Sequence, residues 1–277
     1  MIIRRFGAWP AWAFMALFFV LPLAALLPEA FADRGSAFGR LFANPLLPGA
    51  LRNTLALGLT AGGVSALVGT AVAIELARQP AARRRWMMAL LGLPLAFSGL
   101  VIAYGFILAF GRAGFVTQLL ARLGADPASV GGWIYGAGGL GLAYAYYLVP
   151  RVALSLYPVF ANLDLRPMLA ARTLGATRWR AFNDTVLAQV APSVLSNACL
   201  VAAIAMGTYG TALALAGTQL NILPLMLYAQ VGDGGSDFGV AAALSLLLMA
   251  LCVIVMGAGD ALARRRERTT THANTTH

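Results

Sequence analysis

Six polar side chains lie inside long apolar stretches of this sequence, where a polar group is costly to bury in lipid. The tyrosines among them could pack or anchor at a membrane interface, or they could line a path for a solute. Arg151 directly follows Pro150, and its guanidinium could snorkel to the cytoplasmic face, line such a path or bond to another helix. The candidates for a substrate path are Tyr144, Tyr147, Arg151, Asn197, Thr208 and Tyr209.

The motifs of enzymes are missing from the sequence. It contains no HExxH, no GxSxG with a partner histidine and no paired intramembrane aspartates. His272 and His277 are the only histidines, and two ligands in a tail do not predict a metal site. The Walker A pattern requires a lysine, and all 20 basic residues are arginine, so the chain cannot itself be an ATPase. We expect no catalytic residue, metal or cofactor in this chain.

The elements that carry these residues are predicted to be membrane-spanning helices. The chain is 60% hydrophobic and 11% charged, whereas soluble domains carry about 25% charged residues. Its apolar runs are long and continuous, unlike the short alternating strands of a barrel. The sequence therefore predicts an all-α membrane protein with six transmembrane helices, at about 11–28, 54–77, 87–110, 134–157, 189–213 and 238–262.

The arginines predict the orientation of these helices. The net charge is +10, but most arginines flank apolar segments instead of lining one face, which argues against nucleic-acid binding. Arginine-rich ends and loops alternate with arginine-poor ones, so both termini are expected in the cytoplasm. This gives a cytoplasmic N-terminus over 1–10, a six-helix transmembrane domain over 11–263 and a disordered cytoplasmic tail over 264–277. No cleavable signal peptide is expected.

The loop at about 162–188, between the fourth and fifth helices, holds the most specific local pattern. Asp164 is a plausible helix N-cap, and Gly175 is well placed to end a short helix in the left-handed conformation. A second short helix is expected from about Thr177, with Trp179 and Phe182 at helical spacing. Two interpretations remain open on physical grounds: an amphipathic loop resting on lipid headgroups, or a docking helix for a cytoplasmic partner.

This loop resembles the EAA loop of type I ATP-binding-cassette (ABC) importer permeases, the binding-protein-dependent inner-membrane components. Ala170, Ala171, Gly175 and Leu187 match its spacing, whereas Leu169, Thr185 and Ala188 replace the usual Glu, Ile and Pro. The runs Arg52–Leu55, Met206–Thr211 and Ile222–Leu225 also look familial, and the last two are similar to polyamine, aminoalkylphosphonate and ferric-iron permeases.

The resemblance implies a fold with the coupling loop between helices 4 and 5, and a role as one permease subunit of an ATP-driven importer in a bacterial inner membrane. It implies two ATPase subunits that bind ATP and Mg, a second permease, expected to be a different chain because Glu is missing, and a periplasmic substrate-binding protein. The implied cargo is a polyamine, an aminoalkylphosphonate or ferric iron. The alternative is an ATP-independent secondary transporter or channel. The residues implied to couple to the ATPase are Leu169, Ala170, Ala171, Gly175, Arg178 and Trp179.

Overall fold

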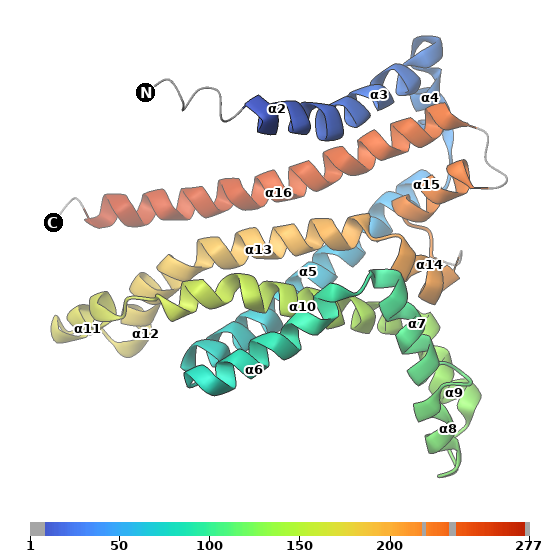
Figure 1. The fold of residues 1–277 in the computed structure, drawn as a ribbon. Helices are drawn as coiled ribbons and strands as arrows, with labels where there is room; N and C mark the ends of the chain where they lie inside the picture. The colour runs from blue at the N-terminus through green and yellow to red at the C-terminus, as the bar shows by residue number, and fades with distance from the viewer. Residues whose placement is uncertain (1–8, 218–219, 233–236, 275–277) are drawn as a thin grey trace. The chain divides into compact units, whose positions relative to one another are not determined.

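The computed structural model describes residues 9–217, 220–232 and 237–274, and within these ranges the chain is helical, without a strand (Figure 1). The chain divides into two compact units. The first comprises Met1–Asn53 and Asn221–Ala250, and the second comprises Thr54–Leu220 and Leu251–His277. Two long helices, α5 (Leu47–Arg78) and α16 (Phe238–Asn274), contribute residues to both units.

Polar side chains connect the first unit between segments far apart in sequence. The amide of Asn53 donates to the carbonyl of Asn221 at 2.9 Å, and the amide of Asn221 donates to the carbonyl of Leu46 at 2.8 Å. Arg40 pairs with Asp237 at the start of α16. Besides the ends of α5 and α16, the unit contains α2 (Trp9–Met15), a π-helical segment (Ala16–Val20), α3 (Leu21–Ala30), α4 (Ala32–Ala43) and α15 (Leu223–Val231).

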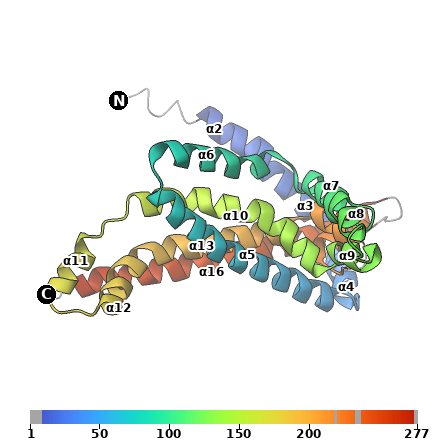
Figure 2. The same cartoon turned by 90° about the horizontal axis from the view of Figure 1, so that it is seen from below.

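The second unit holds every candidate site residue. In Figures 1 and 2 its helices α11 and α12 lie at one end of the unit, and α7, α8 and α9 lie at the other. Besides its parts of α5 and α16, the second unit contains α6 (Ala81–Gly92), α7 (Gly99–Phe110), α8 (Phe115–Ala121), α9 (Pro127–Gly132), α10 (Ala137–Ala161), α11 (Arg166–Thr173), α12 (Arg178–Ala181), α13 (Ala188–Gly207) and α14 (Gly210–Ala216).

Small residues on α5 allow its neighbours in the second unit to approach closely. A Cβ at Gly62 would lie 2.6 Å from the Cβ of Ala202 on α13, and a Cβ at Gly69 would lie 2.6 Å from the Cβ of Val152 on α10. Helices in lipid gain little from the hydrophobic effect and associate through such close van der Waals packing. The glycines of α5 thus hold α10 and α13, which carry the candidate path residues, against one helix.

Five segments of the described chain are long and apolar enough to cross a membrane: Trp12–Ala30, Leu47–Arg78, Gly99–Ala121, Arg178–Gly207 and Phe238–Arg264. They confirm a helical membrane protein. The 25-residue helix α10, expected as the fourth span, is not among them, because tyrosines, two prolines and Arg151 lower its hydropathy. The count of six spans therefore stays a prediction.

The expected continuous helix at 87–110 is wrong. Helix α6 ends at Gly92, a 3₁₀ turn covers Leu93–Ala96, and α7 begins only at Gly99. Pro94 lies in this turn and has no N–H to donate to a helix. Ser98 then caps α7 by accepting from the N–H of Val101 at 3.4 Å. The apolar candidate span starts after this break and extends to Ala121.

The structure also differs from the sequence-based expectation after residue 207. The expected helix over 189–213 is broken, since α13 ends at Gly207 and α14 begins at Gly210. The expected loop between Gly217 and Asp237 contains α15, whose first turn holds Pro224. Helix α16 continues to Asn274, where a disordered tail from residue 264 was expected. The expected N-terminal segment lies mostly outside the described residues.

Candidate functional site

The first helix of the 162–188 loop ends as expected, in a glycine turn. Gly175 has a φ of +90°, the left-handed region that favours glycine. Its N–H donates to the carbonyl of Arg172 at 3.1 Å, and the N–H of Ala176 donates to Ala171 at 3.0 Å. These two bonds form a Schellman motif, which satisfies carbonyls at the end of α11. The glycine turn was therefore predictable from Leu174-Gly175-Ala176.

The start of that helix differs slightly from the prediction. Leu165, not Asp164, is the N-cap of α11. The Asp164 carboxylate, one residue before the cap, instead accepts from the backbone N–H of Arg166, the first residue of α11, at 2.9 Å. Pro167 lies in the first turn as predicted, because its missing N–H is not needed there.

The second expected short helix is not a separate element. Thr177 caps it by accepting from the N–H of Arg180 at 3.3 Å. Helix α12 then passes into a π-helical segment, Phe182–Leu187, which continues directly into α13. The α12 end of the loop is therefore continuous with a long helix.

The loop exposes apolar side chains together with cations. The exposed fraction is 55% for Leu169 and 77% for Trp179, whose ring stacks on Phe182 with centroids 6.1 Å apart. Ala170, Gly175 and Arg178 are also exposed, and Ala171 is half-buried. Helix α11 has no buried residue. Five of the six predicted coupling residues are therefore exposed within the described part of the chain, on α11, on α12 and in the turn between them.

Three of the predicted path residues meet where α13 breaks. The hydroxyl of the fully buried Tyr144 donates to the carbonyl of Thr208 at 3.2 Å. The hydroxyl of Tyr147 lies 3.5 Å from the Thr208 side-chain oxygen. A break in a helix frees backbone carbonyls, and a buried carbonyl needs a donor. Tyr144 of α10 therefore satisfies a backbone carbonyl at the α13–α14 junction, and Tyr147 contacts the side chain of the same residue.

The other path candidates lie apart from this cluster. Asn197 donates to the carbonyl of Ser193 on its own helix at 3.0 Å. Tyr209 is 37% exposed beside Thr208. Arg151 is exposed on α10, one turn beyond Tyr147. The structure thus brings together Tyr144, Tyr147 and Thr208, and it does not join Asn197 to them.

Sequence reasoning missed one close-packed contact and one hydrogen bond in the second unit. Thr211 is fully buried, and a Cβ on Gly99 of α7 would contact its hydroxyl. Ser196 of α13 donates to the carboxylate of Asp260 on α16 at 2.9 Å. The run of threonine, tyrosine and glycine over 207–211 signalled the first contact. No sequence pattern pointed to the bond between Ser196 and Asp260, because the two residues are 64 positions apart.

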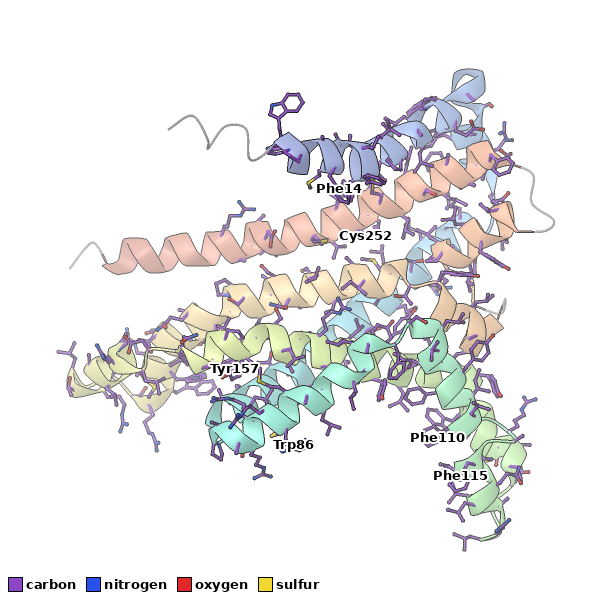
Figure 3. All side chains as sticks on the ribbon, in the orientation of Figure 1. Phe14, Trp86, Phe110, Phe115, Tyr157 and Cys252 are labelled. Atoms are coloured by element: carbon purple, nitrogen blue, oxygen red, sulfur yellow. The ribbon has the colours of Figure 1, made fainter. Side chains whose placement is uncertain are left out.

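Charged groups gather at the end of the second unit that carries α11 and α12. Arg84 of α6 lies over the ring of Tyr157, near the end of α10, at 5.6 Å from the ring centroid (Figure 3). This contact places the arginines of α6 near the end of α10 that leads into α11.

At the other end of the second unit, Asp126 caps α9 by accepting from the N–H groups of Ala128 and Ser129, and these bonds lower the pKa of the Asp126 carboxyl.

Within the described residues, no three His, Cys, Asp or Glu side chains are grouped in a way that could hold a metal ion. The side chain of His272 and the whole of His277 lie outside the description. The expectation of no metal in this chain therefore stays a prediction.

Comparison with known proteins identifies relatives along nearly the whole chain. Sulfate permease 2 of Chlamydomonas reinhardtii is 29% identical over 242 residues, covering 86% of this chain, which in turn spans only 64% of that protein. The sulfate transport system permease protein CysT of Escherichia coli is 26% identical over 255 residues, 91% of this chain and 89% of the relative. The molybdenum transport system permease protein ModB of Mycobacterium tuberculosis is 27% identical over 259 residues, 90% of this chain and 94% of the relative.

A solved structure shares the fold. A chain of a bacterial alginate ABC transporter, crystallised with its alginate-bound periplasmic protein, superposes with a TM-score of 0.67 at 17% identity, covering 96% of this chain and 95% of the other. The pattern of the family described as "Binding-protein-dependent transport system inner membrane component" matches residues 65–268. The chain therefore belongs to this family, the permease subunits of type I ABC importers, and is an integral inner-membrane transport protein.

Proposed function

We propose that this chain, within an ABC importer, couples ATP hydrolysis to transport through the 162–188 loop, with α11 seated in a cytoplasmic ATPase subunit. The observation that carries the proposal is the uncovered surface of α11 and α12, which exposes Leu169 and Trp179 to water. Exposed apolar side chains beside cations are typical of a surface that binds another protein. Lipid headgroups could also cover such a surface, and the experiment below separates the two.

The arginines support a cytoplasmic position for this loop. Arg83, Arg84 and Arg85 on α6 and Arg172 and Arg178 around α11 belong to the same end of the second unit. Arginine-rich short loops stay in the cytoplasm. With this loop inside, both termini are cytoplasmic in a six-span topology. The partners are then two ATPase subunits that bind ATP and Mg, a second permease of different sequence and a periplasmic binding protein.

We further propose a small tetrahedral oxyanion of the sulfate class as cargo. The relatives named above are sulfate and molybdenum permeases. The polyamine, aminoalkylphosphonate and ferric-iron cargo expected from the sequence finds no support in them. The loose similarity of Met206–Thr211 and Ile222–Leu225, on which that expectation rested, covers the junction between α13 and α14 and the start of α15.

The docking role can be tested with two glycines of the same backbone conformation. Gly175 and Gly124 have φ values of +90° and +94°, and a Cβ added to either residue would meet no atom within 4 Å. Gly175→Asp and Gly124→Asp therefore impose the same backbone strain at opposite ends of the unit. In the reconstituted importer we expect Gly175→Asp to abolish uptake driven by ATP, while Gly124→Asp imports normally.

The readouts are ATPase stimulation by the loaded binding protein and uptake of ³⁵S-sulfate into proteoliposomes. Copurification of the ATPase with each variant reports docking directly. Normal uptake by Gly175→Asp would argue against the docking role. If the loop instead rests on lipid, the ATPase should copurify with both variants.

A further inference from the structure

Arg151 is an exposed cation in the interior of α10. Its guanidinium makes no hydrogen bond or ion pair with any residue that the structure describes. Ten residues separate it from Ala161, the last residue of α10, which is about 15 Å along a helix that rises about 1.5 Å per residue. Arginines reach the interface by snorkelling from near helix ends. Arg151 therefore lies in the interior of α10 and not near either of its ends.

The face of α10 that carries Arg151 is polar over several turns. Tyr144 and Tyr147 precede it by seven and four residues, and Ser155 follows by four, so all four share one side of the helix. The tyrosines are buried against the α13–α14 junction, whereas Arg151 and Ser155 are exposed. Val152, by contrast, packs on Gly69 of α5. The stripe therefore runs from a closed end at Thr208 to an open end at Ser155.

Lipid is a poor environment for the open end of this stripe. An arginine at the centre of a bilayer costs about 2.5–3.5 kcal/mol even on the most lenient scale. The cost disappears where the side chain faces water or a bound anion. A permease functions with a partner permease, and the face bearing Arg151 and Ser155 is suited to line the water-filled path of that pair.

We propose that Arg151 selects the cargo by charge, binding a tetrahedral oxyanion as it passes through the membrane. The proposal rests on the proposed function, because it assumes an oxyanion cargo. A guanidinium is always charged, and its planar fork matches two oxygens of an oxyanion. Ser155, one turn further, offers a hydroxyl to the same anion. A single guanidinium with no ion-pair partner among the described residues attracts the anion but binds it weakly enough to release it, as a transport path requires.

The test compares Arg151→Gln and Arg151→Lys in the complete importer, reconstituted with its second permease, ATPase and binding protein. Arg122→Gln, which removes an arginine at the end of α8, is the matched control. We measure ³⁵S-sulfate imported per ATP hydrolysed. Arg151→Gln should lower this ratio at least fivefold while ATP hydrolysis is still stimulated by the loaded binding protein. Arg151→Lys should retain an intermediate ratio, and Arg122→Gln should match the wild type.

Three other outcomes overturn the inference, and they do so for different reasons. An unchanged ratio in Arg151→Gln shows that the charge does not act on the cargo. Failure of Arg151→Gln to assemble with its partners, when Arg151→Lys assembles, shows a structural ion pair with another subunit. A wild-type importer that hydrolyses ATP but imports neither sulfate nor molybdate shows that the proposed cargo itself is wrong. In the first two cases the proposed function stands.

Discussion

Arg40 donates two parallel hydrogen bonds to the carboxylate of Asp237, from Nε to Oδ2 at 2.8 Å and from Nη2 to Oδ1 at 3.0 Å. The same carboxylate accepts from the backbone N–H of Val240 at 3.0 Å and so caps α16. Arg40 also donates to Ser36 on its own helix, at 2.8 Å. One aspartate thus joins α4 to the start of α16 within the first unit, although the two elements are far apart in sequence.

Replacing Asp237 with Asn should destabilise the first unit in a pH-dependent way. The bonds from Arg40, and then those from the backbone, lower the pKa of the Asp237 carboxyl. A lowered folded pKa gives stability that is present above the unfolded value, about 3.9, and is lost as the pH falls through the folded value. Because the side chains of Arg40 and Asp237 are both partly exposed, Asp237→Asn should lower the free energy of unfolding at pH 7 by about 0.5–1 kcal/mol.

Thermal unfolding of the detergent-purified chain between pH 7 and pH 3 measures this effect. The gap in unfolding midpoint between wild type and Asp237→Asn should be fully present at pH 7 and should narrow as the pH falls below about 4. Asp184→Asn is the control, since Asp184 meets Arg180 at a longer 3.6 Å on a more exposed surface. A gap that stays constant over the whole pH range would show that the carboxylate charge is not responsible.

Adjacent glycines on α5 should respond oppositely to alanine. A Cβ at Gly62 would lie 2.9 Å from both the Cα of Ala202 and the carbonyl oxygen of Ala198, so the backbone of α13 must move. A Cβ at Gly63 would meet nothing within 4 Å. Overpacking costs about 1–3 kcal/mol, whereas alanine in a helix is favoured over glycine by about 1 kcal/mol.

Gly62→Ala should therefore lower the unfolding midpoint of the purified chain, and Gly63→Ala should leave it equal or higher. Both substitutions change helix propensity alike, so the difference between their unfolding midpoints reports the contact of Gly62 with α13. Equal midpoints would mean that α5 and α13 do not pack at Gly62.

Leu169 should contribute apolar contact to ATPase docking at the position where the EAA pattern has Glu. Its side chain is 55% exposed, and burying a leucine side chain contributes roughly 1.5–3 kcal/mol. Leu169→Ala should weaken ATPase binding about tenfold, as measured by titrating detergent-solubilised permease with the purified ATPase. The control is Leu123→Ala, which truncates a leucine that is 80% exposed near the opposite end of the unit. Equal affinities for both variants would exclude Leu169 from the interface.

The sequence predicted this loop more accurately than the spans around it. Thr177 and Gly175 act through bonds to residues within five positions, so their roles can be read locally. Pro94 lies inside the stretch expected as one helix at 87–110, yet a 3₁₀ turn separates two helices there, and Ser98 caps the second.

The break at Thr208 escaped prediction for a different reason. Hydropathy averages over a window, and Gly207 to Gly210 sit within an apolar run whose composition changes little. What makes the break tolerable is tertiary, because Tyr144 reaches the freed carbonyl from a helix 64 residues away. Long-range donors of this kind leave no trace in a local pattern.

Tyr144 and Tyr147 should therefore differ in their response to removal of the hydroxyl. Tyr144 is fully buried, and Tyr144→Phe leaves the carbonyl of the half-buried Thr208 without its 3.2 Å donor. An unsatisfied buried acceptor costs about 1–3 kcal/mol. Tyr147→Phe removes only a 3.5 Å contact to the Thr208 hydroxyl, and that hydroxyl keeps its 2.7 Å bond to the carbonyl of Ile204. Unfolding midpoints should fall clearly for Tyr144→Phe and little for Tyr147→Phe. The reverse order would mean that the helix break is held by the side chain of Thr208 and not by its backbone.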